Sequence, residues 1–409
     1  MSAVSGEFQR NWKVVLAAGA GVGVGLTGLP FYTFGVFIKP LSEDMGWSRA
    51  AISTGMLCLN SAVVLTGPFI GSLIDRRGVR TVALLSLVGL AIGFGLLSIS
   101  GPGVATFYMA WLALAFLGCG TTPLTWTRAI TLNFDKRRGL ALGLALLGTG
   151  IASLIGPPLV QKLIAAYGWQ GGYRGMGLFV LLCVVPIVYF GIGSGKSPAQ
   201  SARASAAPLV GLAYGQAMRS GRFWTIACGI FLVILGQAGF TVHLIPLLGD
   251  RGIAPGQAAG VAGLLGLSVI VGRVLVGLLL DRFHAPKVAR IFLALPALAL
   301  AVLHVRADLP SAYFAAALLG LAAGAEVDLL SYLISRYFGL RSYGAIYGTA
   351  LSLFGLGAGL GPILTGLAFD SFGSYDPALL AGIFAFLAGA GLIGMLGRYP
   401  DFSTPNGAR

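Results

Sequence analysis

The chain has 409 residues, of which 56% are hydrophobic and only 10% are charged. Soluble domains carry roughly 25% charged residues, so this composition excludes a water-soluble globular protein. The formal net charge of +14 would suit a nucleic-acid partner if the basic residues formed one patch. They occur instead in short clusters between long apolar runs, which is typical of a protein that crosses the lipid bilayer many times and binds no nucleic acid.

The first apolar run, 14–38, follows a short polar stretch. Its 25 uncharged residues are too many for the core of a signal peptide, and no small-residue cleavage site comes after them. We therefore expect this run to be a membrane span. The four cysteines all fall inside apolar runs, so we predict no disulfide, no metal site and no cofactor.

Along the rest of the chain, further runs are long enough to cross a hydrocarbon core of ~30 Å. Only helices and closed barrels satisfy their backbone groups in lipid, and these runs are too long for barrel strands. We therefore predict an all-α integral membrane protein. Its twelve transmembrane helices are expected at 14–38, 50–74, 81–99, 105–133, 140–166, 175–193, 223–248, 257–280, 286–305, 311–335, 343–369 and 377–397.

The distribution of basic residues predicts how these spans are oriented, because Lys and Arg favour the cytoplasmic side. With both termini inside, 19 of the 27 Lys and Arg residues lie in inner segments and 6 in outer loops. The remaining two, Arg128 and Arg273, fall within spans. We therefore expect cytoplasmic termini in a bacterial cytoplasmic (inner) membrane. We also expect the protein to be a monomer.

The longest connection, at 193–222, is rich in Ser, Ala, Gly and Pro, which is typical of a flexible linker. It divides the spans six to six. The sequence therefore predicts an N-terminal six-helix bundle at 1–195, a cytoplasmic linker at 196–222 and a C-terminal six-helix bundle at 223–409.

The two halves repeat each other at a nearly constant offset. Gly46, Gly71, Asp75 and Arg76 recur 206 residues later, and Gly139, Gly143, Gly156, Pro157 and Gly168 recur 205 residues later. The later copies are Gly252, Gly277, Asp281, Arg282, Gly344, Gly348, Gly361, Pro362 and Gly373. Such repeats are a mark of secondary transporters, in which two pseudo-symmetric bundles rock about a central site.

Two loop motifs follow the second and eighth spans. Both place an aspartate beside an arginine at a helix end, where such charges could latch one bundle to the other or merely fix the topology. The predicted gating residues are Gly71, Asp75 and Arg76 in the first copy, and Gly277, Asp281 and Arg282 in the second. The first motif, "GSLIDRRGVR" at 71–80, resembles the loop signature of the major facilitator superfamily.

Four longer stretches resemble one branch of that superfamily, the monocarboxylate porters and oxalate–formate antiporters. They lie at 34–53, 137–159, 272–282 and 324–348. The resemblance implies the major facilitator fold and transport of a small organic anion. It also implies that the arginine of the eighth span, Arg273, binds the carboxylate of the substrate.

Arg273 invites the same interpretation on physical grounds. It lies eight residues before Asp281, hence ~12 Å deep at 1.5 Å per residue. An arginine at this depth costs about 2.5–3.5 kcal/mol on insertion scales, so it should face a water-filled cavity or a partner. Its planar fork suits a carboxylate. A structural ion pair with Glu326 or Asp328 is the alternative.

Two departures from the branch concern proton coupling. In animal monocarboxylate porters an aspartate precedes the arginine by one turn, and here that position is Val269. The first-span lysine of those porters corresponds to Tyr32, and the eleventh span lacks the lysine of oxalate–formate antiporters. Glu326 and Asp328 in the tenth span are the remaining candidates for carrying a proton, and their spacing points them to roughly opposite sides of a helix.

Five further polar residues are predicted to line the substrate site. Arg128 either reaches into the cavity or snorkels to the interface. His243 either lines the outer mouth or packs between helices. The full set of predicted substrate-binding residues is Arg273, Tyr32, Arg128, His243, Thr122 and Tyr332.

The sequence contains no nucleotide-hydrolysing or catalytic motif, so we expect a transporter driven by a gradient and not an enzyme. The favoured function is proton-coupled transport of a monocarboxylate such as lactate or pyruvate. Two alternatives stay open. One is proton-driven export of a cationic or amphipathic drug, and the other is a membrane sensor that transports nothing.

Overall fold

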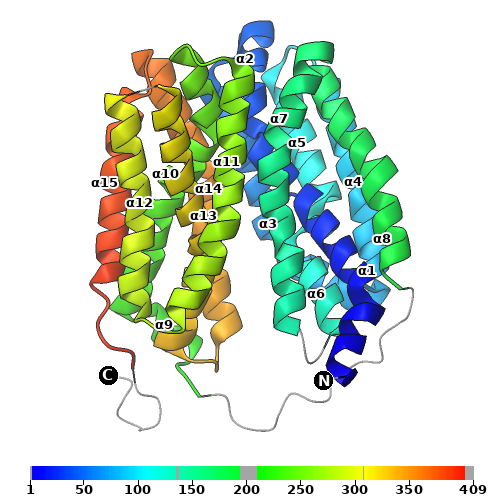
Figure 1. The fold of residues 1–409 in the computed structure, drawn as a ribbon, viewed down its shortest axis with the longest axis vertical. Helices are drawn as coiled ribbons and strands as arrows, with labels where there is room; N and C mark the ends of the chain where they lie inside the picture. The colour runs from blue at the N-terminus through cyan, green and yellow to red at the C-terminus, as the bar shows by residue number, and fades with distance from the viewer. Residues whose placement is uncertain (1, 135–137, 194–209, 307, 401–409) are drawn as a thin grey trace. The chain divides into compact units, whose positions relative to one another are not determined.

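The computed structural model describes residues 2–134, 138–193, 210–306 and 308–400, and these are almost entirely helical (Figure 1). The helices of the first half are α1 (Ser2–Val24), α2 (Leu29–Met45), α3 (Arg49–Arg77), α4 (Val79–Ser98), α5 (Val104–Leu117), α6 (Pro123–Asn133), α7 (Arg138–Phe179) and α8 (Val185–Gly191). Those of the second half are α9 (Tyr214–Met218), α10 (Gly221–Asp250), α11 (Pro255–Leu280), α12 (Ala285–Val305), α13 (Leu309–Phe338), α14 (Tyr343–Phe372) and α15 (Asp376–Gly394).

The predicted all-α membrane architecture is confirmed. Each predicted span coincides with one helix, with part of a bent helix, or with two consecutive helices. Among the described residues, nine helices or merged helices are long and apolar enough to cross a bilayer. Large apolar side chains such as Leu182, Phe384 and Met395 are exposed, as lipid-facing residues must be.

Two of the predicted spans are broken, and the breaks contact each other. The first span is interrupted between α1 and α2, and the fourth by a 3₁₀ turn at Cys119–Thr121. The backbone N–H of Leu26 donates to the hydroxyl of Thr121 over 3.2 Å. A Cβ on Gly25 would lie 2.2 Å from the carbonyl oxygen of Thr121. The second break thus satisfies a backbone donor of the first, which lipid could not do.

The chain divides into two compact units. Unit 1 comprises Met1–Ala199 and Thr241–Leu267, and unit 2 comprises Gln200–Phe240 and Ser268–Arg409. The division passes through α10 and α11, so the ends of these helices nearest to their shared connection belong to unit 1. That assignment is important for the ion pair described below.

The repeat predicted from the sequence is visible in the backbone. Gly46 and Gly252 both have positive φ, 67° and 86°. The pair Gly168 and Gly373 behaves alike, with φ of 70° and 67°. A residue with a side chain is strained in this conformation, which explains why glycine occupies equivalent positions in both halves.

The end of the predicted linker is docked on unit 2. The N–H of Leu212 donates to the carbonyl of Phe338, and the N–H of Leu340 donates to that of Val210, both over 2.9 Å. The hydroxyls of Tyr214 and Thr349 lie 3.1 Å apart. Residues 210–222 therefore belong to the structured C-terminal half, whereas 194–209 lie outside the described residues.

Candidate functional site

Arg273 forms an ion pair with Asp328 in unit 2. The Nε atom of Arg273, on α11, lies 3.5 Å from the Oδ2 atom of Asp328, on α13. The two side chains keep 25% and 41% of their surface exposed. Of the two acids that the sequence offered as partners for Arg273, the structure pairs it with Asp328. The pair is partly open to its surroundings, so a ligand carboxylate could replace that of Asp328.

Glycines bring the two helices of this pair close together. A Cβ on Gly324 would lie 2.2 Å from the carbonyl oxygen of Val269, and one on Gly272 would lie 2.3 Å from that of Leu321. Such contacts let helix backbones approach closely in a membrane. Val269, one turn before Arg273 on α11, is not an acid, and the acid beside Arg273 comes from the neighbouring helix α13.

Glu326 has different surroundings from Asp328, as the two-residue spacing predicts. Its side chain is 3% exposed, and its Oε1 atom has no hydrogen-bond partner among the described residues. A carboxylate ion without a partner is far too costly to bury in an apolar interior. The physical inference is that Glu326 is uncharged in this conformation.

Two aromatic residues near Asp328 were not predicted from the sequence. The rings of Tyr343 and Tyr347 stack with centroids 5.5 Å apart and an interplanar angle of 6°. Tyr347 is close enough to Asp328 for an electrostatic interaction. The hydroxyl of Ser331 donates to the backbone carbonyl of Asp328 over 3.1 Å. Besides Arg273, the carboxylate of Asp328 therefore has a polar neighbour on α14, Tyr347.

Tyr332 lies on the same pair of helices as Arg273, with its hydroxyl 3.5 Å from the carbonyl oxygen of Leu280. The other predicted lining residues belong to unit 1. Tyr32 is partly buried on α2, Thr122 precedes α6 as its N-cap residue, and Arg128 is exposed on α6. Of the six predicted substrate-binding residues, the structure therefore places Arg273 and Tyr332 on α11 and α13 and the other four in unit 1.

His243 is fully buried in unit 1. Its Nε2 atom lies 3.0 Å from the hydroxyl of Ser53. This contact joins α10 to α3 and shows a histidine engaged in packing between helices. It therefore favours the packing interpretation of His243 over the lining one.

The predicted gating residues lie near the C-terminal ends of α3 and α11. Arg76 is exposed in the last turn of α3, whereas the surroundings of Gly71 and of the Asp75 side chain lie outside the described part of the structure. Gly277 has open space around it on α11, and Asp281 and Arg282 are exposed just after that helix.

His284 anchors the loop that follows the second gating motif. The rings of His284 and Tyr399 pack together with their centroids 4.5 Å apart. The guanidinium of Arg336 lies over the ring of Tyr399, 4.6 Å from its centroid. Burial lowers the pKa of His284, and the charges of Lys287 and Arg336 lower it further. This imidazole is therefore neutral at physiological pH.

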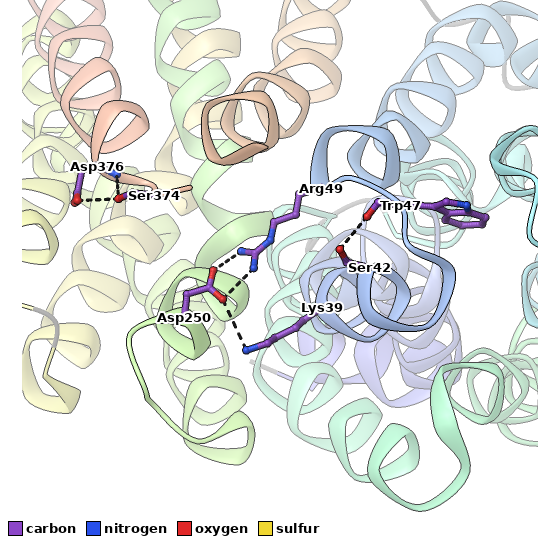
Figure 2. A network of polar contacts seen from close by, with 7 residues as sticks. All are labelled: Lys39, Ser42, Trp47, Arg49, Asp250, Ser374 and Asp376. Carbon is purple, nitrogen blue, oxygen red and sulfur yellow. Dashed lines mark hydrogen bonds and ion pairs between the residues drawn. The ribbon is translucent and has the colours of Figure 1, made fainter. Parts of the chain in front are cut away.

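A second ion pair, which the sequence did not reveal, lies at the predicted outer ends of the helices of unit 1 (Figure 2). Arg49 at the start of α3 binds Asp250 at the end of α10 through both of its terminal nitrogens, one of them over 2.9 Å. The Nζ atom of Lys39, on α2, lies 3.7 Å from the same carboxylate. The side chains of Arg49 and Asp250 are 9% and 23% exposed.

The local sequence positions Arg49 firmly. Gly46 ends α2 in the left-handed conformation, and Ser48 caps α3 by accepting from the N–H of Ala51 over 3.2 Å. Arg49 is consequently the first residue of α3. A cation at a helix N-terminus and an anion at a C-terminus both oppose the helix dipole. The placement of Arg49 and Asp250 is therefore explained by their pairing and not by helix stability.

Within the described ranges, no three His, Cys, Asp or Glu side chains come together in a way that could hold a metal ion. The four cysteines carry no disulfide.

Comparison with known proteins places this geometry in a family. A model described as Major Facilitator Superfamily matches residues 20–362. Human monocarboxylate transporter 11 is 28% identical over 94% of this chain and 83% of its own length. Bovine (Bos taurus) monocarboxylate transporter 13 is 26% identical over 91% of this chain and 86% of its own length.

A bacterial homologue of the human lysosomal transporter Spinster shares the fold. Its structure covers 93% of both chains with a TM-score of 0.66 at 18% identity. The family model spans most of the sequence and the fold agrees with it. The chain therefore belongs to the Major Facilitator Superfamily and is a membrane transporter, not an enzyme.

Proposed function

We propose that this transporter carries a small monocarboxylate, such as lactate or pyruvate, together with a proton. The observation that carries the proposal is the partly exposed ion pair between Arg273 and Asp328, with atoms 3.5 Å apart. Placing an arginine within a membrane span costs free energy unless it faces a water-filled cavity or has a partner. Its fork binds a carboxylate well, and the relatives named as monocarboxylate transporters support this class of substrate.

Direct competition at Arg273 would couple the anion to the proton. The substrate carboxylate and the carboxylate of Asp328 need the same guanidinium. When Asp328 takes up a proton, it loses its charge and releases Arg273, which then binds the anion. One proton and one anion thus enter the site together, and the net charge of the site stays constant.

Glu326 has a different part in this proposal. It is buried and, by the cost of burying a charge, already uncharged. In this proposal Glu326 keeps its proton in every conformation, so it does not load and release a proton during transport. We therefore assign coupling to Asp328 and a packing role to Glu326.

The proposal also covers the two bundles, their orientation in the membrane and the gating motifs. Two bundles, 1–195 and 223–409, would rock about the site, joined by the linker at 196–222. Both termini would be cytoplasmic in a bacterial inner membrane, and a single chain would suffice. The aspartate–arginine motifs at Asp75 and Asp281 would latch the inner ends of the helices.

Uptake into proteoliposomes tests the proposal. With an inward proton gradient, the protein should concentrate labelled L-lactate or pyruvate, and a protonophore should abolish the accumulation. Replacing Arg273 by alanine should abolish uptake while the protein still folds and inserts. Transport of lipophilic cations without carboxylate uptake would establish drug export instead, and no flux of either class would point to a sensor.

A further inference from the structure

Lys39, Arg49 and Asp250 form a carboxylate site whose ligand is a residue of the chain itself. Arg49 holds the Asp250 carboxylate through two nitrogens, and Lys39 approaches the same Oδ1 atom (Figure 2). A bidentate arginine supported by a lysine is the arrangement with which proteins bind small carboxylates. Two cations, one from α2 and one from α3, therefore share one carboxylate.

Two acids, Glu43 and Asp44, lie on the same helix as Lys39. Asp44 accepts a hydrogen bond from the indole N–H of Trp169 over 2.7 Å and is engaged there. Glu43 is exposed on α2. The Arg49 side chain is more than nine-tenths buried, so its position is fixed by packing as well as by its ligand.

The helix segment that supplies Asp250 packs on unit 1 through glycines. A Cβ on Gly35 would lie 2.2 Å from the carbonyl oxygen of Val242, which brings α2 and α10 into backbone contact. A Cβ on Gly266 would lie 2.5 Å from the backbone nitrogen of Leu154. Residues 241–267 continue α10 and α11, yet they cluster with unit 1. These contacts bring helix backbones close together through glycines.

We propose that Lys39 and Arg49 form an outer binding site for the transported carboxylate, and that Asp250 occupies this site when the segment 241–267 is docked. When the segment withdraws, Asp250 leaves and the substrate anion takes its place on the two cations. The inference rests on the proposed function, since it assumes an anionic cargo. It adds an entry site that is separate from Arg273 and closed by an internal mimic of the substrate.

The directions in which two substitutions shift the KM distinguish this binding site from an ion pair that only holds the helices together. D250N removes the internal competitor and leaves both cations in place, so it should lower the KM for external L-lactate, by about threefold to tenfold. R49Q should raise that KM by about tenfold, and K39Q by about threefold, since charge-assisted contacts to the anion are lost. If the three residues form only a latch, D250N and R49Q break the same bond and must shift KM in the same direction.

Matched variants control for general charge and for folding. K162Q and E43Q remove one exposed charge each from the predicted outer side and should leave KM within about twofold of the wild type. The double variant R49Q/D250N leaves no unpaired buried charge, so it should fold even if R49Q does not. Its KM should stay raised, whereas a simple latch predicts the behaviour of D250N.

The measurement is the initial rate of L-lactate uptake by intact cells expressing each variant, corrected for the amount of protein in the membrane. Opposite shifts for D250N and for the variants that lack Arg49 or Lys39 support the outer site. Equal shifts overturn it. If R273A abolishes uptake in the same series, the proposed function stands even when the outer site fails. If the wild type takes up no carboxylate, both fall.

Discussion

The two arginines that pair with aspartates differ in how they are held. Arg49 binds Asp250 through two nitrogens with 9% of its side chain exposed, whereas the Nε atom of Arg273 lies 3.5 Å from Oδ2 of Asp328 with 25% of the arginine side chain exposed. The first pair is closed to a ligand while the segment 241–267 is docked, whereas the second pair is open to a ligand as it stands. Exposure and geometry, and not residue type, distinguish an ion pair that must open before it exchanges partners from one that can exchange directly.

The largest effect is expected when the exchangeable pair loses its cation. R273A should reduce proton-driven uptake of L-lactate by roughly 100-fold or more, because the anion loses a bidentate contact in a poorly solvated site. R273K should recover only part of the rate, since an ammonium lacks the planar fork. Uptake by proteoliposomes measures both.

R306A, which removes an exposed arginine at the predicted outer end of α12, serves as the control and should transport normally. Uptake by R273A at the wild-type rate would place the anion site elsewhere.

The next effect concerns the acid of the same pair. D328N imitates the protonated state and leaves Arg273 continuously available, so exchange of L-lactate across the membrane should persist while accumulation driven by a proton gradient disappears. Counterflow and gradient-driven uptake, measured on the same vesicles, separate the two activities. Retained accumulation in D328N would assign coupling to another group.

A smaller effect is expected at the tightly held pair, where packing is tested instead of charge. The Cβ added by G35A would lie 2.2 Å from the carbonyl oxygen of Val242, so α2 and α10 must move apart at a cost of about 1–3 kcal/mol. The thermal unfolding midpoint in detergent should therefore fall.

G95A is the matched control, because nothing lies within 4 Å of a Cβ on Gly95. Alanine is the better helix former, so this variant should be as stable as the wild type or more stable by up to about 1 kcal/mol. Equal midpoints for G35A and G95A would contradict the close contact between α2 and α10.

The smallest effect is expected for E326Q. Glutamine is nearly isosteric with the uncharged acid, so both the rate and the proton dependence of uptake should stay within about twofold of the wild type. The pH profile of L-lactate uptake checks this. Loss of proton dependence in E326Q with its retention in D328N would exchange the roles of the two acids.

The membrane spans and the arginine within the eighth span, Arg273, were predictable because both follow from local composition. A run of apolar residues determines a membrane helix, and one charge within it stands out. The breaks at Gly25 and Thr121 were not predictable, because the apolar runs continue through them. At these breaks the backbone N–H of Leu26 is satisfied by the hydroxyl of Thr121, which comes from a distant segment of the chain.

The partners of the charged residues required the fold. From the sequence, either Glu326 or Asp328 could form an ion pair with Arg273. Only the packing of α11 against α13 shows that Asp328 is the partner. Arg49 and Asp250 are 201 residues apart, and Arg49 counted only as an outer-loop cation. The one local signal was that both residues oppose their helix dipoles, which indicates a compensating partner but does not identify it.

Equilibrium binding of L-lactate to the purified protein across a pH series tests the exchange at Arg273 most directly. For the wild type, the affinity should weaken as the pH rises, by up to about tenfold per pH unit, because one proton must bind Asp328 for each anion that replaces it. For D328N, the affinity should be high and independent of pH as long as the ligand stays ionised. The same pH dependence in both proteins would contradict the exchange.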